Sequence, residues 1–221
     1  LLTKIPPRTT PAVRIEIRGP AGVLEAALDA AAQPALATAV ICHPHPLQAG
    51  TMNNKVVTTL SRAFTRLGAD TVRFNFRGVG GSAGSYADGL GEREDALAVL
   101  EWCRERWPER RLYLGGFSFG GAVAAAIAAR ATPDGLVTVA PAVDRLPTDF
   151  VAPSCPWLLV HGDADDVVPA RPVLEWAATL TAPPRTVVLP GVGHFFHGRL
   201  PALLEAVTDF FGADFTALRG S

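Results

Sequence analysis

The segment around Ser118 contains the residue types that nucleophilic catalysis requires. It reads GFSFG over residues 116–120, a G-x-S-x-G pattern, between the apolar run 111–116 and the alanine-rich run 121–130. We expect a strand, a sharp turn and a helix here, with glycine on both sides of the serine because larger neighbours would clash in a strained turn. The first N–H groups of the helix would face the hydroxyl, where the helix dipole favours an anion. The pattern predicts a serine nucleophile.

A serine hydroxyl is a weak nucleophile unless a base removes its proton, and a carboxylate must orient that base. Among the five histidines, His194 follows the last predicted strand, on a loop before the final predicted helix. The segment HGDADDVVP follows the preceding strand and offers three carboxylates, Asp163, Asp165 and Asp166. Nucleophile, acid and base would then all lie at the carboxyl ends of predicted parallel strands, where open α/β sheets bind their ligands. The sequence therefore predicts a Ser-His-Asp triad.

Strand and helix patterns alternate along the chain and predict the scaffold for these residues. Residues 13–19 alternate apolar and polar side chains, and 24–30 is the expected antiparallel hairpin partner. Short apolar runs typical of buried parallel strands follow at 37–42, 70–76, 111–116, 135–140, 156–162 and 185–191. Segments with helical spacing lie at 52–67, 92–107, 121–130, 172–180 and 200–211. We expect one α/β domain over residues 1–221, with a flexible lead-in at 1–12, a mostly parallel sheet of about eight strands and helices on both faces.

From about residue 13 to 211 the chain resembles the α/β-hydrolase superfamily, and most of all its small, lidless bacterial branch related to dienelactone hydrolases. The matching segments are GFSFG, HGDADDVVP, GVGHFF and FNFRGVGGSAG. The segment HPHPLQAGTMNNKVV also resembles a block in small bacterial members known only as predicted hydrolases. The resemblance implies the α/β-hydrolase fold and the chain order Ser, Asp, His for the triad.

The resemblance also implies which aspartate is the acid. In the family pattern HGxxDxxVP the acid occupies the fifth position, which is Asp165 in this chain, so Asp163 and Asp166 are expected to be loop or turn residues. Dienelactone hydrolases use a cysteine nucleophile where this chain has Ser118, so their lactone substrate is not implied. The expected triad is Ser118, His194 and Asp165.

An oxyanion hole needs two N–H donors, and the first should be the backbone of Phe119, the residue after the nucleophile. The family takes the second donor from the loop after the third strand, usually just after a His-Gly pair. Here that loop reads HPHPL over residues 43–47. Because proline has no N–H, His45 is the first candidate and Leu47 the second.

Parts of the sequence are also compatible with three other functional classes. His43 and His45 form an H-x-H pair, which could serve a metal-dependent hydrolase together with His194 and Asp165. The chain is short for the (β/α)₈ barrel in which such a pair usually serves, and Ser118 would then have no role. Residues 78–83 fit a G-x-G-x-x-G/A nucleotide-binding pattern, but a loop follows where that motif requires a helix. A non-catalytic binding protein on the hydrolase fold is the third option, and the intact triad argues against it. We expect His43 and His161 to make structural hydrogen bonds at strand ends, and His197 to be an exposed or helix-start residue.

Composition and charge narrow the functional class. The chain has 20 basic and 21 acidic residues and a net charge of −1, which predicts no nucleic-acid partner. No apolar stretch approaches the roughly 20 residues of a membrane span, and three separated cysteines favour reduced thiols in the cytoplasm. Residues 142–155 are too few for a multi-helix lid. We expect a cytoplasmic bacterial serine esterase with neither metal nor organic cofactor, acting on small carboxylic esters or thioesters. Its oligomeric state is not indicated.

Overall fold

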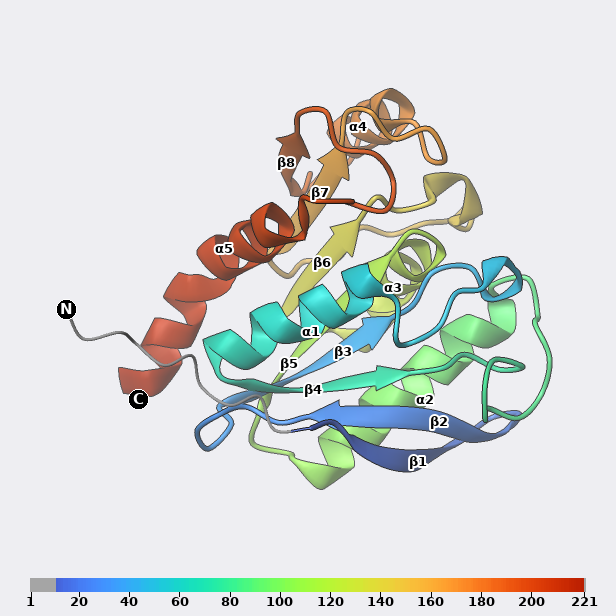
Figure 1. Cartoon of the computed structure of the whole chain (residues 1–221), viewed down its shortest axis with the longest axis vertical. Coiled ribbons are helices and arrows are strands. Elements are labelled where there is room, and N and C mark those ends of the chain that lie inside the picture. The colour runs from blue at the N-terminus through green and yellow to red at the C-terminus, as the bar shows by residue number, and fades with distance from the viewer. Residues whose placement is uncertain (1–10, 221) are drawn as a thin grey trace.

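The computed structural model describes residues 11–220, and an eight-stranded sheet forms its centre. The strands are β1 (Val13–Gly19), β2 (Gly22–Asp29), β3 (Ala37–Cys42), β4 (Ala69–Phe74), β5 (Arg111–Phe117), β6 (Gly135–Val139), β7 (Trp157–Gly162) and β8 (Arg185–Leu189). Their order in the sheet is β1-β2-β4-β3-β5-β6-β7-β8 (Figure 1). β2 pairs antiparallel with both β1 and β4, whereas all other neighbours pair in parallel. The predicted mostly parallel sheet with an antiparallel N-terminal hairpin is confirmed. Of the predicted lead-in, residues 1–10 lie outside the described residues.

Five helices cover the two faces of this sheet within the described part of the chain. They are α1 (Lys55–Leu67), α2 (Leu90–Arg106), α3 (Phe119–Ala131), α4 (Ala170–Ala178) and α5 (Leu200–Gly220). Side chains of α1 and α5 form a buried cluster on one face, and those of α2 and α3 form another on the opposite face. Figure 1 shows α1 and α2 on opposite sides of the central strands. Because both faces are covered, every residue of β3, β6 and β7 is buried.

Two helices differ from their predicted spans by three or more residues at one end. The predicted helix 52–67 begins only at Lys55, because the side chain of Asn54 accepts a hydrogen bond from the Val56 N–H at 2.8 Å and caps the helix there. The predicted helix 200–211 continues to Gly220. Its extra turns are stabilised by Phe215, which is 1% exposed and whose ring stacks on that of Tyr113 at 5.0 Å between centroids. Phe215 continues the buried stripe of the helix one turn further than predicted.

The loops that directly follow the carboxyl ends of the parallel strands contain no helix longer than a three-residue 3-10 turn in the described part of the chain. Between β6 and β7 the one helical element is a three-residue 3-10 turn, η2 (Val143–Arg145). The segment from β4 to α2 contains neither helix nor strand. The expectation that no lid covers this edge is therefore confirmed for the described residues. Within the same residues, none of the helices has the length and apolar character of a membrane span.

Candidate active site

Ser118 lies on a sharp turn between β5 and α3. Its backbone has φ 55° and ψ −118°, a region that residues other than glycine rarely adopt, and its N–H donates to the Val139 carbonyl oxygen at 2.9 Å. A Cβ on Gly116 would overlap the Gly120 carbonyl, and a Cβ on Gly120 would overlap the carbonyl oxygens of Cys42 and His43. Both glycines are required because backbone segments pass directly against them, as the G-x-S-x-G pattern predicts.

The structure brings the other two predicted triad residues to this serine. Nε2 of His194 lies 3.1 Å from Oγ of Ser118, and Nδ1 of His194 lies 2.7 Å from Oδ2 of Asp165. All three residues are buried, at 8% exposure for Ser118, 4% for His194 and 7% for Asp165. The imidazole thus contacts the hydroxyl with one nitrogen and the carboxylate with the other.

The Asp165 carboxylate is held from several sides. Its Oδ1 accepts hydrogen bonds from the backbone N–H groups of Val167 at 2.9 Å and Val168 at 2.7 Å. Burial by itself raises the pKa of Asp165, but hydrogen bonds from His161, His194 and the Val168 N–H outweigh burial and hold this pKa well below its usual range. The carboxylate is therefore ionised at neutral pH and accepts a proton-bearing nitrogen from His194.

The two other aspartates of this segment point elsewhere. Asp163 accepts a hydrogen bond from the Gly191 N–H at 2.6 Å and so ties the β7 loop to the loop after β8. Asp166 is exposed at the surface. Both agree with the expected loop and turn roles. His197 is exposed beside Phe195, with 5.9 Å between ring centroids.

The two candidate oxyanion donors, the backbone N–H groups of Phe119 and His45, make no hydrogen bond among the described residues. Phe119 is the first residue of α3, so its N–H has no acceptor within the helix. The N–H of His45 makes no hydrogen bond to any described residue, and the rings of His45 and Phe119 lie 5.0 Å apart between centroids. The Leu47 N–H, by contrast, already donates to Nδ1 of His45 at 3.2 Å. Of the two predicted second donors, His45 is therefore the free one.

The H-x-H pair does not form a ligand set in this structure. His43 is fully buried, and its Nδ1 lies against the Pro44 carbonyl oxygen at 2.5 Å while its Nε2 accepts from the Phe76 N–H at 3.0 Å. Burial lowers the pKa of His43 to about 4, so its ring is neutral. Across residues 11–220, no cluster of three or more His, Cys, Asp or Glu side chains could hold a metal ion. His43 instead ties the end of β3 to the end of β4.

The glycine-rich segment 78–83, which matches the G-x-G-x-x-G/A pattern, has a structural role. The N–H of Gly81 donates to Oε2 of Glu25 at 2.8 Å, and the same oxygen accepts from Nδ2 of Asn75. Oδ1 of Asn75 accepts the Met52 N–H at 2.8 Å. Asn75 therefore bridges the glycine loop after β4 and the loop that carries His45. Sequence reasoning missed this residue, although a polar side chain inside the apolar run 70–76 was a signal for it.

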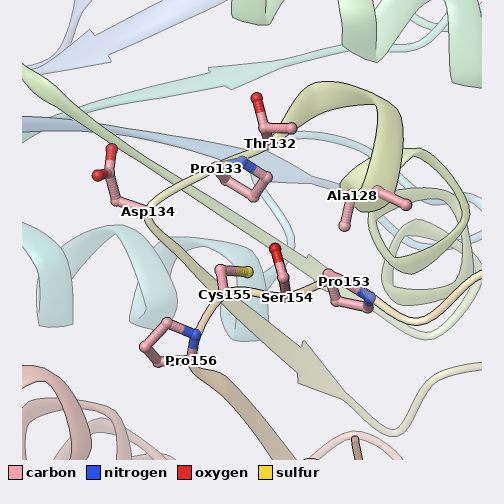
Figure 2. Close-up of a pocket in the computed structure, with 9 residues that line it drawn as sticks. Ala128, Thr132, Pro133, Asp134, Pro153, Ser154, Cys155 and Pro156 are labelled. Carbon is pink, nitrogen blue, oxygen red and sulfur yellow. The ribbon is translucent and has the colours of Figure 1, made fainter. Parts of the chain in front are cut away.

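The hollow in Figure 2 lies at the amino ends of the parallel strands, the end of the sheet opposite to Ser118. Its lining includes Asp134, just before β6, and Pro156, just before β7, whereas Ser118 follows the carboxyl end of β5. Burial raises the pKa of Cys155 in this hollow to about 11, so the thiol is protonated at neutral pH. This hollow therefore has no part in the chemistry of Ser118.

A mostly parallel sheet with a serine on a strained strand-to-helix turn defines the α/β-hydrolase class. Residues 37–153 match the family described as serine aminopeptidase, S33. The chain belongs to this family of α/β serine hydrolases.

Two solved structures of α/β serine hydrolases and one curated protein are similar to this chain over most of its length. A lidless α/β serine hydrolase from Xanthomonas campestris is 39% identical, with a TM-score of 0.87 over 95% of this chain and 97% of that one. An α/β serine hydrolase homologue from Coxiella burnetii is 44% identical, with a TM-score of 0.86 over 89% and 96% of the two chains. An uncharacterised protein of Rickettsia prowazekii is 32% identical over 208 residues, which cover 89% of this chain and 87% of that protein.

Proposed function

We propose that the protein hydrolyses small carboxylic esters through an acyl-enzyme formed on Ser118. One observation carries this proposal: a single imidazole, His194, lies 3.1 Å from the serine hydroxyl and 2.7 Å from the ionised Asp165. The carboxylate fixes the tautomer in which Nδ1 bears a proton and Nε2 is free to act as a base. That is the arrangement a serine hydroxyl needs to become a nucleophile.

The reaction proceeds in two halves. In the first, Oγ of Ser118 attacks the ester carbonyl carbon while its proton passes to Nε2 of His194, and a tetrahedral oxyanion forms. This intermediate collapses with cleavage of the bond to the alcohol oxygen, which takes the proton from Nε2. In the second half, water loses a proton to the same nitrogen and attacks the acyl-enzyme, and the carboxylic acid leaves as Ser118 regains its proton.

Backbone N–H groups of Phe119 and His45 are the proposed oxyanion donors. Both are free of intramolecular partners in the described residues, and each donor pointed at a developing oxyanion contributes about 10²- to 10³-fold to the rate. The N–H of Leu47 is the weaker candidate because it is already bonded to His45. The positive end of the α3 dipole adds to the stabilisation of the anion.

The open edge of the sheet supports a small-molecule ester as the substrate, with thioesters as the second option. The loops over this end of the sheet hold no helix longer than the three-residue turns η1 (Pro46–Gln48) and η2 among the described residues, so no cap is present to bury a long acyl chain. A cytoplasmic location stays a prediction from the composition.

Covalent labelling tests the proposal directly. A fluorophosphonate probe should react with the purified protein, and peptide mass spectrometry should find the adduct on Ser118. The labelled protein should lose its hydrolysis of p-nitrophenyl acetate, and EDTA should leave that activity unchanged. An unlabelled Ser118, or hydrolysis that survives full labelling, would contradict the mechanism. Activity that EDTA removes and zinc restores would favour the metal-dependent alternative.

A further inference from the structure

The imidazole of His45 is held at both of its nitrogens. Nδ1 accepts the Leu47 N–H at 3.2 Å, within η1 (Pro46–Gln48), and Nε2 lies 3.2 Å from Oη of Tyr86. The ring of His45 also packs against the rings of Tyr86 and Phe119, each at 5.0 Å between centroids. The two residues whose backbone N–H groups are the proposed oxyanion donors, His45 and Phe119, therefore contact each other through their side chains.

The donors and acceptors available determine the direction of each hydrogen bond in the series that links Leu47, His45, Tyr86 and Asp88. The Leu47 N–H can only donate, so Nδ1 of His45 carries no proton and the neutral ring has its proton on Nε2. Nε2 then donates to the oxygen of Tyr86, and the Tyr86 hydroxyl donates its own proton to Oδ1 of Asp88 at 3.1 Å. The tyrosine oxygen is thus the acceptor that selects this tautomer of His45.

The charges around the ring favour its neutral form. Burial lowers the pKa of His45 below its usual value, and Arg145 lowers it further, against smaller opposing effects of Glu92 and Asp88. Burial also raises the pKa of Tyr86, as does its hydrogen bond to Asp88. At neutral pH the tyrosine is therefore protonated and the histidine is uncharged, as the hydrogen-bond directions require.

Tyr86 itself lies on a segment that is fixed to α2. The carboxylate of Glu92, which is fully buried, accepts the N–H of Ala87 at 2.9 Å and that of Gly89 at 2.8 Å. These charge-assisted bonds, one and three residues after Tyr86, restrict where its hydroxyl can lie. At the surface, Asp88 forms an ion pair with Arg145 at 3.1 Å. Their side chains are 80% and 43% exposed, so this pair contributes little to fixing the position of Tyr86.

We propose that Tyr86 is a positioning residue for the oxyanion hole, acting through the side chain of His45. The inference rests on the proposed function. Prolines on both sides already restrict the backbone of His45, which has φ −52° and ψ 123°. The Tyr86 hydroxyl accepts a hydrogen bond from Nε2 of His45 and so fixes the orientation of the imidazole. Nδ1 of the same imidazole accepts the Leu47 N–H, which leaves the His45 N–H as the free donor of this loop for the oxyanion. Because the oxyanion exists only in the transition state and intermediates, Tyr86 should act on kcat more than on KM.

The two tyrosines of the chain provide a matched pair of variants. Tyr86→Phe removes only the hydroxyl that accepts from His45. Tyr113→Phe removes a hydroxyl that is buried without a hydrogen-bond partner in the described residues and lies in the core. For p-nitrophenyl acetate we expect Tyr86→Phe to lower kcat by about 3- to 10-fold with little change in KM, the effect of one weakened interaction in the transition state. Tyr113→Phe should keep both constants.

His45 offers a rescue experiment on the same chain of bonds. Asparagine can accept an N–H two residues ahead with its side-chain oxygen, so His45→Asn preserves the bond to Leu47, whereas His45→Ala cannot. We expect kcat to fall by about 10- to 100-fold in His45→Ala and to recover in large part in His45→Asn. Equal kcat values for Tyr86→Phe and Tyr113→Phe, or equal losses in the two His45 variants, would overturn the inference. Failure of the proposed function looks different, because the unmutated protein would then leave Ser118 unlabelled by the fluorophosphonate.

Discussion

Nε2 of His161 lies 3.5 Å from Oδ2 of Asp165, and both side chains are fully buried. The same nitrogen is 2.9 Å from the Val168 carbonyl oxygen. The carboxylate that contacts His194 therefore has a second imidazole beside it, contributed by the end of β7. His161 and the backbone N–H groups of Val167 and Val168 together fix the orientation of the Asp165 carboxylate before any substrate binds.

Replacing the nucleophile should abolish turnover. We expect Ser118→Ala to lower kcat for ester hydrolysis by about 10⁴- to 10⁶-fold, because the remaining oxyanion donors cannot supply a covalent step. Steady-state kinetics on p-nitrophenyl acetate, with thermal unfolding to verify the fold, measure this. Turnover close to that of the unmutated protein would refute the assignment.

The two neighbouring aspartates should behave differently. Asp165→Asn keeps the shape of the side chain but favours the wrong tautomer of His194, so kcat should drop by about 10⁴-fold. Asp166→Asn changes an exposed residue and should have little effect. Comparing kcat of the two variants tests the assignment of the acid. The reverse ranking would mean that a different aspartate orients the base.

Gly120→Ala should be destabilising. The added Cβ would overlap the carbonyl oxygens of Cys42 and His43, which belong to backbone and cannot rotate away. The free energy of unfolding, measured by urea denaturation, should fall by about 1–3 kcal/mol or more. Gly212→Ala is the control, since its Cβ meets nothing within 4 Å in α5 and should stabilise the protein by about 0.5–1 kcal/mol. Equal midpoints for the two variants would refute the close approach at Gly120.

Protonation of His43 should destabilise the fold in mild acid. Its pKa falls from 6.5 to about 4 on folding because of burial, so the unfolded chain binds the proton at a pH where the folded chain does not. Stability from this group is complete above pH 6.5 and is lost as the pH falls toward about 4, by about 3 kcal/mol in total. Urea midpoints measured across this range test it. His43→Gln removes the titration and should flatten the profile; an unchanged slope would speak against this role.

The open site should favour short acyl groups. Each buried CH₂ of an acyl chain contributes about 0.8 kcal/mol, and one left in water contributes almost nothing. Over p-nitrophenyl esters from acetate to palmitate, we expect kcat/KM to level off or fall beyond short chains, with no jump in rate at the micelle threshold. A maximum at long chains would instead indicate an apolar acyl site that the fold does not suggest.

Local sequence determined the parts of this protein that depend on near neighbours along the chain. The GFSFG turn requires glycines where backbone crosses backbone, so the position of Ser118 could be predicted from its own segment. Alternating strand and helix patterns determined the mostly parallel sheet, because each amphipathic element must bury one face. His194 could be predicted because the order of strands along the chain brings its loop to the same edge.

Only the tertiary structure decided the contacts between side chains from different loops. Residue patterns left three aspartates open, and the path of the loop after β7 brings Oδ2 of Asp165 to 2.7 Å from His194. His45 lies on the loop after β3 and Tyr86 on the loop after β4, so the contact between the His45 ring and the Tyr86 hydroxyl forms only when the sheet places these two loops side by side. The contact between Tyr86 and His45 has no signature in either segment, because hydrogen bonding requires atoms within about 3 Å and that precision arises only when the sheet aligns the loops.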